Sequence, residues 1–328
     1  MRRLARAALA LAFGGALLLA VGVAAVLERA GAAGPSTATT TVVIERGTGV
    51  AAIARRLADA GVVADPWLVR LYARLIGAER ALTAGEYRFP PAVSTAEVVR
   101  MLRDHAVVQY RFTLVEGWTV AQTFDALAAA EDLTGELPPP PPEGRLLPDT
   151  YFFQRGDTRA GLVRRMREAM AAELAAAWAE RAADLPLADV DAALTLASII
   201  EKETAVAAER RLVAGVFVNR LRRGMKLQTD PTVIYAVTDG DGPLGRALTR
   251  RDLEVDDPYN TYRYPGLPPG PIANPGRAAL RAAVNPAATD YLYFVADGSG
   301  GHAFARTLAE HNANVRAWRQ VQRDREDG

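Results

Sequence analysis

The sequence predicts an α+β fold in which a single N-terminal transmembrane helix precedes a small α/β subdomain and a larger mixed α/β domain. Half of the 328 residues are hydrophobic, which is ample for a folded core. An uncharged apolar run near the N-terminus has the length of a membrane span. Beyond it, short β-rich runs alternate with amphipathic helical patterns, first in a short stretch and then in a longer one.

The composition excludes several classes of function. The 39 basic and 38 acidic residues nearly cancel, which gives no electrostatic basis for binding nucleic acid. The chain has no cysteine, so disulfides, thiolate metal ligands and cysteine nucleophiles are excluded. The chain has three histidines, His105, His302 and His311, which are few for a histidine-based metal site. We therefore expect no metal site.

The N-terminal run has the features of a membrane anchor. Arg2, Arg3 and Arg6 precede the uncharged segment Ala7–Leu27, which as a helix would cross about 30 Å of hydrocarbon. Arginine before the run and almost none after it predict that the N-terminus stays inside and the body is exported. The alternative is a cleaved signal peptide, because small residues follow at 30–34. Secretory apolar cores usually have about 7–15 residues, so we expect an anchor.

Composition shifts divide the rest of the chain. Strand signals at 41–45 and 85–89 enclose two helical patterns, one with Ile53 and Leu57 and one with Trp67, Leu71 and Leu75 on one face. Ser94 and Glu97 form a capping-box pattern before another helix. The predicted parts are a cytoplasmic tail at 1–6, a transmembrane helix at 7–27, a linker at 28–41, a subdomain at 42–104 and a larger domain at 105–328.

The larger domain has its own landmarks. A β-rich run spans 107–115, and five consecutive prolines at 138–142 predict an exposed polyproline segment. Helical patterns follow at 158–184 and from Asp189 to about Thr204.

The end of that last helix carries the first candidate site. Glu201 and Glu203 are two residues apart, so they lie on different helix faces. Glu203 shares a face with Ile199 and Ile200, whereas Glu201 lies over a smaller, more polar surface. A carboxyl beside branched apolar groups loses hydration, and its pKa rises into the range of a general acid for glycosidic cleavage. The alternative is that these glutamates are solvated charges at a helix end and have no catalytic role.

Two further segments group polar side chains on turns. Gln228, Thr229 and Asp230 precede a proline, and hydrogen-bonding groups of this density suit a sugar site as well as a simple helix-capping turn. The second segment combines aromatic, amide and hydroxyl groups ahead of a stiff Pro/Gly loop, which suits stacking on sugar faces as well as ordinary loop packing. Its members are Tyr259, Asn260, Thr261 and Tyr262.

A glycine-rich run, Gly298-Ser-Gly-Gly-His302, superficially resembles a serine hydrolase motif. It lacks the G-x-S-x-G pattern of a strand-to-helix elbow. We interpret it as polar, glycine-rich surface.

Several sequence motifs, taken in their order along the chain, resemble the YceG-like family of endolytic murein transglycosylases. The resemblance extends from about Val42 to the C-terminus. The matching stretches are Glu116-Gly-Trp-Thr, Leu147-Pro-Asp-Thr-Tyr, Ala197-Ser-Ile-Ile-Glu-Lys-Glu-Thr-Ala-Val, Leu227-Gln-Thr-Asp-Pro-Thr-Val-Ile-Tyr, Tyr259-Asn-Thr-Tyr, Gly266-Leu-Pro-Pro-Gly-Pro-Ile and Tyr291-Leu-Tyr-Phe-Val-Ala. The polyproline run is a departure that affects only a loop between subdomains. The resemblance implies that residues 42–104 are a LysM-like, glycan-binding subdomain and that 105–328 is a lytic transglycosylase catalytic domain.

The resemblance also implies a reaction and its residues. Lytic transglycosylases place their acid directly before Ser or Thr at a helix end, which Glu203-Thr204 matches, with Glu201 as the alternative. The 228–230 and 259–262 segments would bind substrate. The expected activity is a non-hydrolytic cut between N-acetylmuramic acid and N-acetylglucosamine that leaves 1,6-anhydro ends, without a cofactor. The enzyme would sit in the inner membrane with its body in the periplasm and associate with peptidoglycan synthases.

Two other hypotheses remain open at this point. One is a glycoside hydrolase that uses water, with Glu203 as acid and Asp230 as base. The other is a catalytically silent scaffold that binds glycan through residues 42–104.

Overall fold

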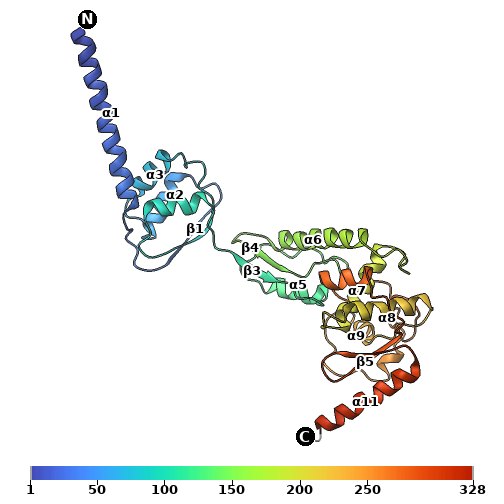
Figure 1. The fold of residues 1–328 in the computed structure, drawn as a ribbon. Coiled ribbons are helices and arrows are strands. Elements are labelled where there is room, and N and C mark those ends of the chain that lie inside the picture. The colour runs from blue at the N-terminus through green and yellow to red at the C-terminus, as the bar shows by residue number, and fades with distance from the viewer. Residues whose placement is uncertain (1, 327–328) are drawn as a thin grey trace. The chain divides into compact units, whose positions relative to one another are not determined.

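The computed structural model describes residues 2–326, and its elements form two compact units (Figure 1). The first unit comprises residues up to Tyr110 and the returning segment Phe152–Gly156, and the second comprises 111–151 and 157–328. We had placed the division after residue 104, without the returning segment. A buried carboxylate explains the difference, because Glu86 accepts hydrogen bonds from the Tyr110 hydroxyl at 2.8 Å and from Arg155 Nε at 2.7 Å.

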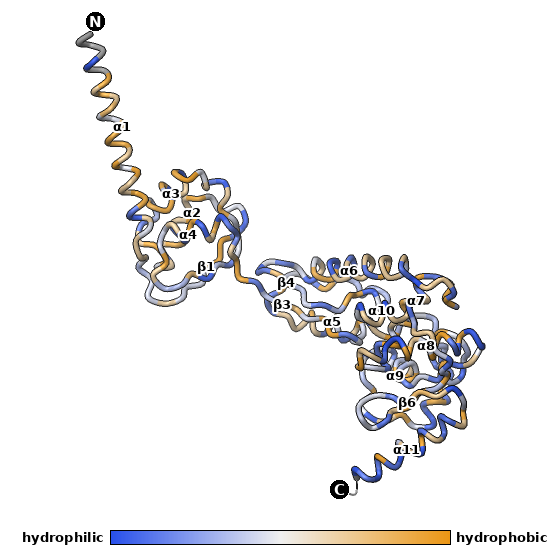
Figure 2. The backbone as a smooth tube through the Cα atoms, viewed as in Figure 1, coloured by the Kyte–Doolittle hydropathy of each residue, from blue (hydrophilic) through white to orange (hydrophobic). Residues whose placement is uncertain are grey.

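The N-terminal helix α1 spans Arg2–Gly31. Its segment Leu9–Gly31 is long and apolar enough to cross a membrane, and none of the most apolar stretch is buried by protein. The tube in Figure 2 is accordingly apolar along most of α1. Leu11 and Leu18 are more than three-quarters exposed, an arrangement that is costly in water and favourable in lipid. The same features fit a signal sequence.

The C-terminal end of α1 packs on the first unit, against α3 (Pro66–Leu75) and α4 (Thr95–Arg103). Ala30 is fully buried there, and Arg29 lies 3.8 Å from the Asp65 carboxylate. The adjoining Gly34 donates its backbone N–H to the Ala92 carbonyl at 3.1 Å. The end of the apolar helix is thus part of the folded first unit.

The first unit has a small antiparallel sheet covered by helices. β1 (Thr40–Ile44) pairs with β2 (Gly85–Phe89), with Thr40 opposite Phe89 and Ile44 opposite Gly85. α2 (Val50–Asp59) buries Ile53 and Leu57 as the periodicity predicted, and the Ser94 side chain caps α4 by accepting from Glu97 N–H.

Helix α3 does not bury the face that carries Trp67, Leu71 and Leu75. Trp67 is 59% exposed and Leu75 is 40% exposed, whereas the buried side chains are Leu68, Val69 and Ala73. The apolar residues of this helix occupy most of its circumference, so the sequence spacing allowed two faces. α2, α4 and the end of α1 pack against this helix, and Val69 and Ala73 join the core of the unit.

The chain passes between the units within a second pair of strands, β3 (Tyr110–Thr113) and β4 (Thr150–Phe153). In the second unit, the β5–β6 hairpin pairs Tyr293 with Ala305 and Ala296 with His302. The remaining elements are α5 (Val120–Ala128), α6 (Arg159–Ala179), α7 (Val190–Glu203), α8 (Arg210–Arg222), α9 (Asp230–Thr238), η1 (Asp252–Glu254), α10 (Arg277–Val284), β5 (Tyr293–Ala296), β6 (His302–Ala305) and α11 (Leu308–Glu326). The five prolines at 138–142 lie outside any helix or strand, as the sequence predicted.

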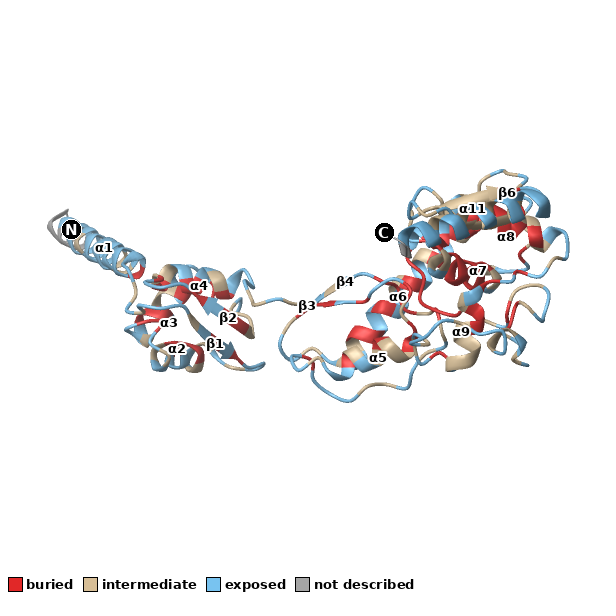
Figure 3. Ribbon diagram, turned by 90° about the horizontal axis from the view of Figure 1, so that it is seen from below, coloured by how far each residue is buried: buried red, intermediate tan, exposed pale blue. Residues whose placement is uncertain are grey.

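Helix α7 is the centre of the second unit. The core that surrounds it draws on α6, α8 and α10, and every residue from Ala193 to Ile200 is buried (Figure 3). Asp189 starts the helix by accepting hydrogen bonds from the Asp191 and Ala192 N–H groups, as expected of an N-cap. The helix ends at Glu203, so its last turn brings carboxylates to the edge of the core.

We predict that α1 is retained as an anchor, because its end is packed into the first unit and its exposed length is apolar. The full-length protein should stay in the membrane pellet after alkaline carbonate washing and should dissolve in detergent. N-terminal sequencing should find the intact run. A mature N-terminus beyond residue 30, together with release into the soluble fraction, would contradict the prediction.

Candidate functional site

Glu203, the last residue of α7, is half-buried at the edge of the core. Its carboxylate is hydrogen-bonded to the Thr229 hydroxyl. Burial raises the pKa of Glu203 to about 7, and the Thr229 bond opposes that rise in part. The negative charge of Asp230 adds to the rise, whereas the charges of His302 and Arg220 lower the pKa. The carboxyl can therefore carry a proton near neutrality, as a general acid requires.

Glu201 is buried as well, but polar groups surround it. Its side chain is 5% exposed, and it accepts the Gly276 N–H at 2.8 Å and lies 3.7 Å from the Arg210 guanidinium. Arg210 also lies 3.9 Å from Glu116. Burial raises the pKa of Glu201, and the bond from Gly276 counters this. Glu201 thus holds the N-terminus of α10 against α7.

The two predicted polar segments lie side by side. The Thr261 carbonyl accepts the Gln228 N–H at 3.2 Å, and the Thr261 hydroxyl accepts the Thr229 N–H at 3.1 Å. The Tyr262 hydroxyl donates to Asp230 at 2.7 Å. These bonds fix the turn before α9, and through Thr229 they fix the surroundings of Glu203.

The members of these segments have different exposures. Gln228 and Asp230 are exposed, and Gln228 has a φ of 49°, an uncommon backbone conformation for this residue type. Asn260 is fully buried, donating to the Leu253 and Val255 carbonyls and accepting the Tyr262 N–H. Its amide is therefore already satisfied within the protein. These bonds shape the loop, and the role of Asn260 in substrate binding stays a prediction.

Tyr259 is half-buried and packs against Tyr235 of α9, with the ring centroids 4.8 Å apart. Burial raises the pKa of both phenols. Like Asn260, it holds the loop against α9.

A cavity of about 530 Å³ adjoins the end of α7 and the start of α9, although Glu201, Glu203 and Asp230 are not among its lining residues. Lys202 and Pro231 line it, and these residues directly adjoin Glu203 and Asp230 in the chain. Trp118 and Tyr235 provide aromatic walls, and Gln122 provides an amide. An aromatic and apolar lining with a few polar groups is typical of ligand pockets.

One buried amide connects the loops around this cavity. Asn274 accepts the Leu146 N–H at 3.0 Å with its side-chain oxygen and donates from its side-chain nitrogen to the Trp118 carbonyl at 2.9 Å. Its carbonyl accepts the Gly117 N–H at 3.0 Å. Asn274 therefore joins the turn at Gly117 and Trp118 to the segment at Leu146.

Sequence reasoning missed four charged groups near these loops. Arg220 donates to the Leu292 and Leu227 carbonyls from the interior of α8. Glu209 pairs with His302, and Glu143 accepts the Val120 N–H at the start of α5, where burial raises the pKa of Glu143 to about 7. Apart from the bond between Arg220 and Leu227, these partners lie at least 23 positions apart in sequence, so no local pattern predicts the pairs.

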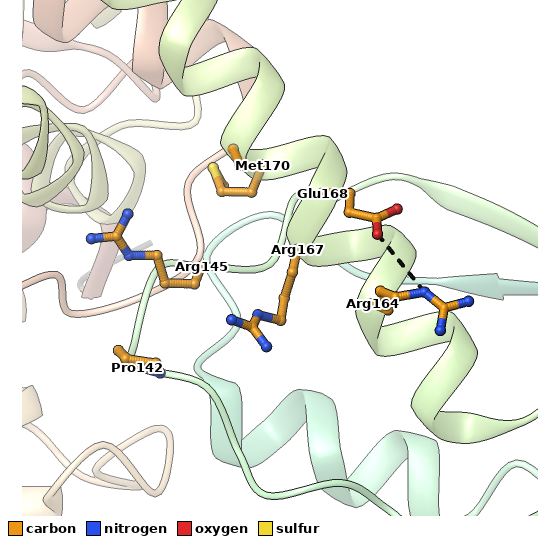
Figure 4. A pocket seen from close by; sticks show the side chains of 7 residues that line it. Pro142, Arg145, Arg164, Arg167, Glu168 and Met170 are labelled. Carbon is orange, nitrogen blue, oxygen red and sulfur yellow. Dashed lines mark ion pairs between the residues drawn. The ribbon is translucent and has the colours of Figure 1, made fainter.

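A second cavity of about 500 Å³ lies between α6 and the segment at 142–145 (Figure 4). Arg145 and Arg167 line it, and Arg145 pairs at 2.6 Å with Asp191 in the first turn of α7. A helix of this length spans roughly 20 Å, so this cavity is separate from the Glu203 site. Within residues 2–326, no group of three or more His, Asp or Glu side chains is placed to hold a metal ion.

We predict that Glu201 contributes mainly to stability. Glu201→Ala would leave the Gly276 N–H without a partner and Arg210 with only the more distant Glu116, so the free energy of unfolding should fall by about 1–3 kcal/mol. Thermal melting of the purified variant measures this loss. Asn260→Ala should melt lower for the same reason, whereas exposed Gln228→Ala should leave the melting temperature nearly unchanged. Unchanged melting of the Glu201 and Asn260 variants would contradict the assignment.

Comparison with known proteins agrees with the motifs. The model of the YceG-like family matches residues 42–317. A Bacillus subtilis protein named endolytic murein transglycosylase is 33% identical over 309 residues, covering 84% of each chain. A Streptococcus pneumoniae protein of the same name is 31% identical, and the match covers 84% of this chain but 57% of that protein. The crystal structure of a putative YceG-like protein from Listeria monocytogenes aligns with a TM-score of 0.52, at 32% identity, over 85% of this chain and 99% of that one. The chain described here belongs to the YceG-like family.

Proposed function

We propose that this protein is an endolytic peptidoglycan lytic transglycosylase that cuts glycan strands between N-acetylmuramic acid and N-acetylglucosamine, with Glu203 as its acid. The observation that carries the proposal is the buried Glu203 carboxyl, whose pKa is raised to about 7 beside the 228–230 turn. Family membership and the names of the relatives support the substrate class.

In the proposed reaction, protonated Glu203 gives its proton to the glycosidic oxygen as the bond to the anomeric carbon breaks. The muramoyl 6-hydroxyl then attacks that carbon, and its proton passes to the Glu203 carboxylate. A 1,6-anhydro ring forms, and the acid is restored. Because the nucleophile belongs to the substrate, the reaction requires neither a second enzyme carboxylate nor a cofactor.

The polar segments have two roles in this scheme. Gln228, Asp230 and Tyr262 are exposed or half-buried, so we assign them to direct contact with the sugars. Thr229 and Thr261 are buried and hydrogen-bonded around Glu203, so they orient the acid. The internally satisfied Tyr259 and Asn260 hold the loop that carries them.

The same proposal places the protein in the cell. Helix α1 would anchor it in the inner membrane, with both units in the periplasm, and residues 42–104 would act as a LysM-like glycan-binding subdomain. Cleavage of growing glycan strands would terminate them during elongation of the wall. The enzyme would then act close to peptidoglycan synthases.

A hydrolytic reaction is the second candidate, because one observation favours it. Asp230 is exposed, oriented by Tyr262, and close enough to raise the pKa of Glu203. An aspartate in that position is placed to activate water as a general base. A silent scaffold is a weaker alternative, since a protonated buried acid has no role in mere glycan binding.

The mass of the product separates these reactions. Full-length protein in detergent micelles should release muropeptides with 1,6-anhydro ends from purified peptidoglycan, detected by mass spectrometry. Products heavier by one water would identify a hydrolase, and intact strands would identify a scaffold.

Substitution of the acid gives a sharper prediction. Glu203→Gln keeps the size of the side chain but cannot give and reclaim a proton, so the rate should fall about 10²–10⁴-fold. The fold should survive, because a neutral amide is less costly to bury than a charge. Wild-type activity requires protonated Glu203, so the rate should decline as the pH rises through about 7. Glu201→Gln is the matched control and should keep most activity; the reverse result would make Glu201 the acid.

A further inference from the structure

The outward face of α3 combines apolar and positively charged side chains. Trp67 and Leu75 are exposed, and the half-buried Leu71 lies between them at helical spacing, so the three form one ridge. Arg70 and Arg74, both exposed, lie one turn apart beside this ridge. The structure describes α3 in full, and none of its exposed residues carries a carboxylate, hydroxyl or amide. A contiguous face of this kind is costly in water and indicates contact with another surface.

The end of the apolar helix α1 lies beside the start of α3. Arg29 of α1 is 3.8 Å from the carboxylate of Asp65, the residue directly before α3. Trp67 follows two residues later, so its backbone lies within about 7 Å of Asp65 along the chain. The candidate membrane span ends at Gly31, and the headgroup layer of a bilayer is roughly 5–8 Å thick on each side. Trp67 is thus within reach of lipid headgroups when α1 spans a bilayer.

The attachment between α1 and the first unit is short and closely packed. Ala30 is fully buried where α1 meets α3 and α4, and the Gly34 N–H bonds to the Ala92 carbonyl at 3.1 Å. A Cβ on Gly34 would clash with the Val93 carbonyl oxygen, so the chain passes the unit at a distance that only glycine permits. These contacts restrain the unit at the end of α1 and keep α3 beside the span (Figures 1 and 3).

We propose that the outward face of α3 rests on the lipid surface at which α1 ends. Trp67, Leu71 and Leu75 enter the interfacial layer, where tryptophan is enriched in membrane proteins and where amphipathic helices bury their apolar face. Arg70 and Arg74 meet anionic headgroups, because an arginine can keep its charge in water while its stem covers apolar surface. The inference rests on the part of the proposed function that retains α1 in the membrane, and it is independent of the proposed reaction.

Two other occupants fit this face less well. A glycan presents hydroxyl and N-acetyl groups that need both donors and acceptors, whereas the exposed polar groups of α3 are guanidinium groups, which only donate. A symmetric contact between two copies of the chain would bring the same arginines together, and like charges oppose that contact. An anionic lipid surface complements both the charge and the apolar ridge.

The test uses the full-length protein, which has no native cysteine, in lipid nanodiscs that hold one copy each. Leu75→Cys carries an environment-sensitive fluorophore, and the lipids are phosphatidylethanolamine and anionic phosphatidylglycerol with a nitroxide near the headgroup. The matched control is the same label at Val43→Cys, an exposed apolar position on β1 in the same unit. The nitroxide should quench the label at Leu75 at least about twofold more strongly, because that label enters the interfacial layer.

The role of the arginines is tested in the same labelled protein. Arg70→Gln combined with Arg74→Gln should lower the quenching by about half, because each arginine near an anionic surface adds attraction. Replacing the anionic lipid by phosphatidylcholine should have a similar effect on the unsubstituted chain. Arg55→Gln combined with Arg88→Gln is the matched control, since both arginines are exposed on other elements of the first unit. This pair of substitutions should leave the quenching unchanged.

Each alternative gives a different result. Equal quenching at Leu75 and Val43, or quenching that ignores both the arginines and the headgroup charge, would overturn the inference. A label at Leu75 that responds only to added soluble glycan would identify a glycan-binding face, and one that responds only when discs hold two copies would identify a dimer contact. Failure of α1 to insert would remove the anchor and the inference together, whereas failure to cleave glycan would contradict the proposed reaction alone.

Discussion

The free-energy cost of burying carboxylates at the end of α7 organises the second unit. The helix is enclosed by core side chains along most of its length, and its C-terminal end carries the negative side of the helix dipole. Both effects disfavour a charged Glu201 or Glu203. The two residues differ in their polar partners. Glu201 accepts a backbone N–H and pairs with a guanidinium, whereas Glu203 is bonded to one hydroxyl. The first is stabilised as a structural anion and the second is left as an acid.

The loops around this helix end are held by internal hydrogen bonds rather than by regular sheet. Asn274 joins the turns at Gly117 and Leu146, and Thr261 joins the loop at 259–262 to the turn before α9. Such satisfied polar groups stabilise one arrangement, because any alternative leaves buried donors or acceptors without partners. The exposed side chains of Gln228 and Asp230 can thus project from a rigid base.

Much of the fold followed from local patterns. The capping signals of Ser94 and Asp189, the apolar spacing of Ile53 and Leu57, and the proline run all lie where the periodicity placed them. The outward face of α3 did not follow, because apolar residues around most of a helix leave its orientation to tertiary packing.

In the candidate site, too, local patterns did not predict the contacts between distant segments. Pattern and family resemblance brought the 228–230 and 259–262 segments forward, and they do lie together. The burial of Glu201, the inward amide of Asn260 and the pairing of His302 with Glu209 depend on contacts between distant segments. The glycine run shows why this matters. Gly301 follows no hydrolase pattern, and only the structure shows that a Cβ there would lie 2.6 Å from a Glu209 oxygen. His302 is bonded to this glutamate, 93 positions away, and no local spacing records that contact.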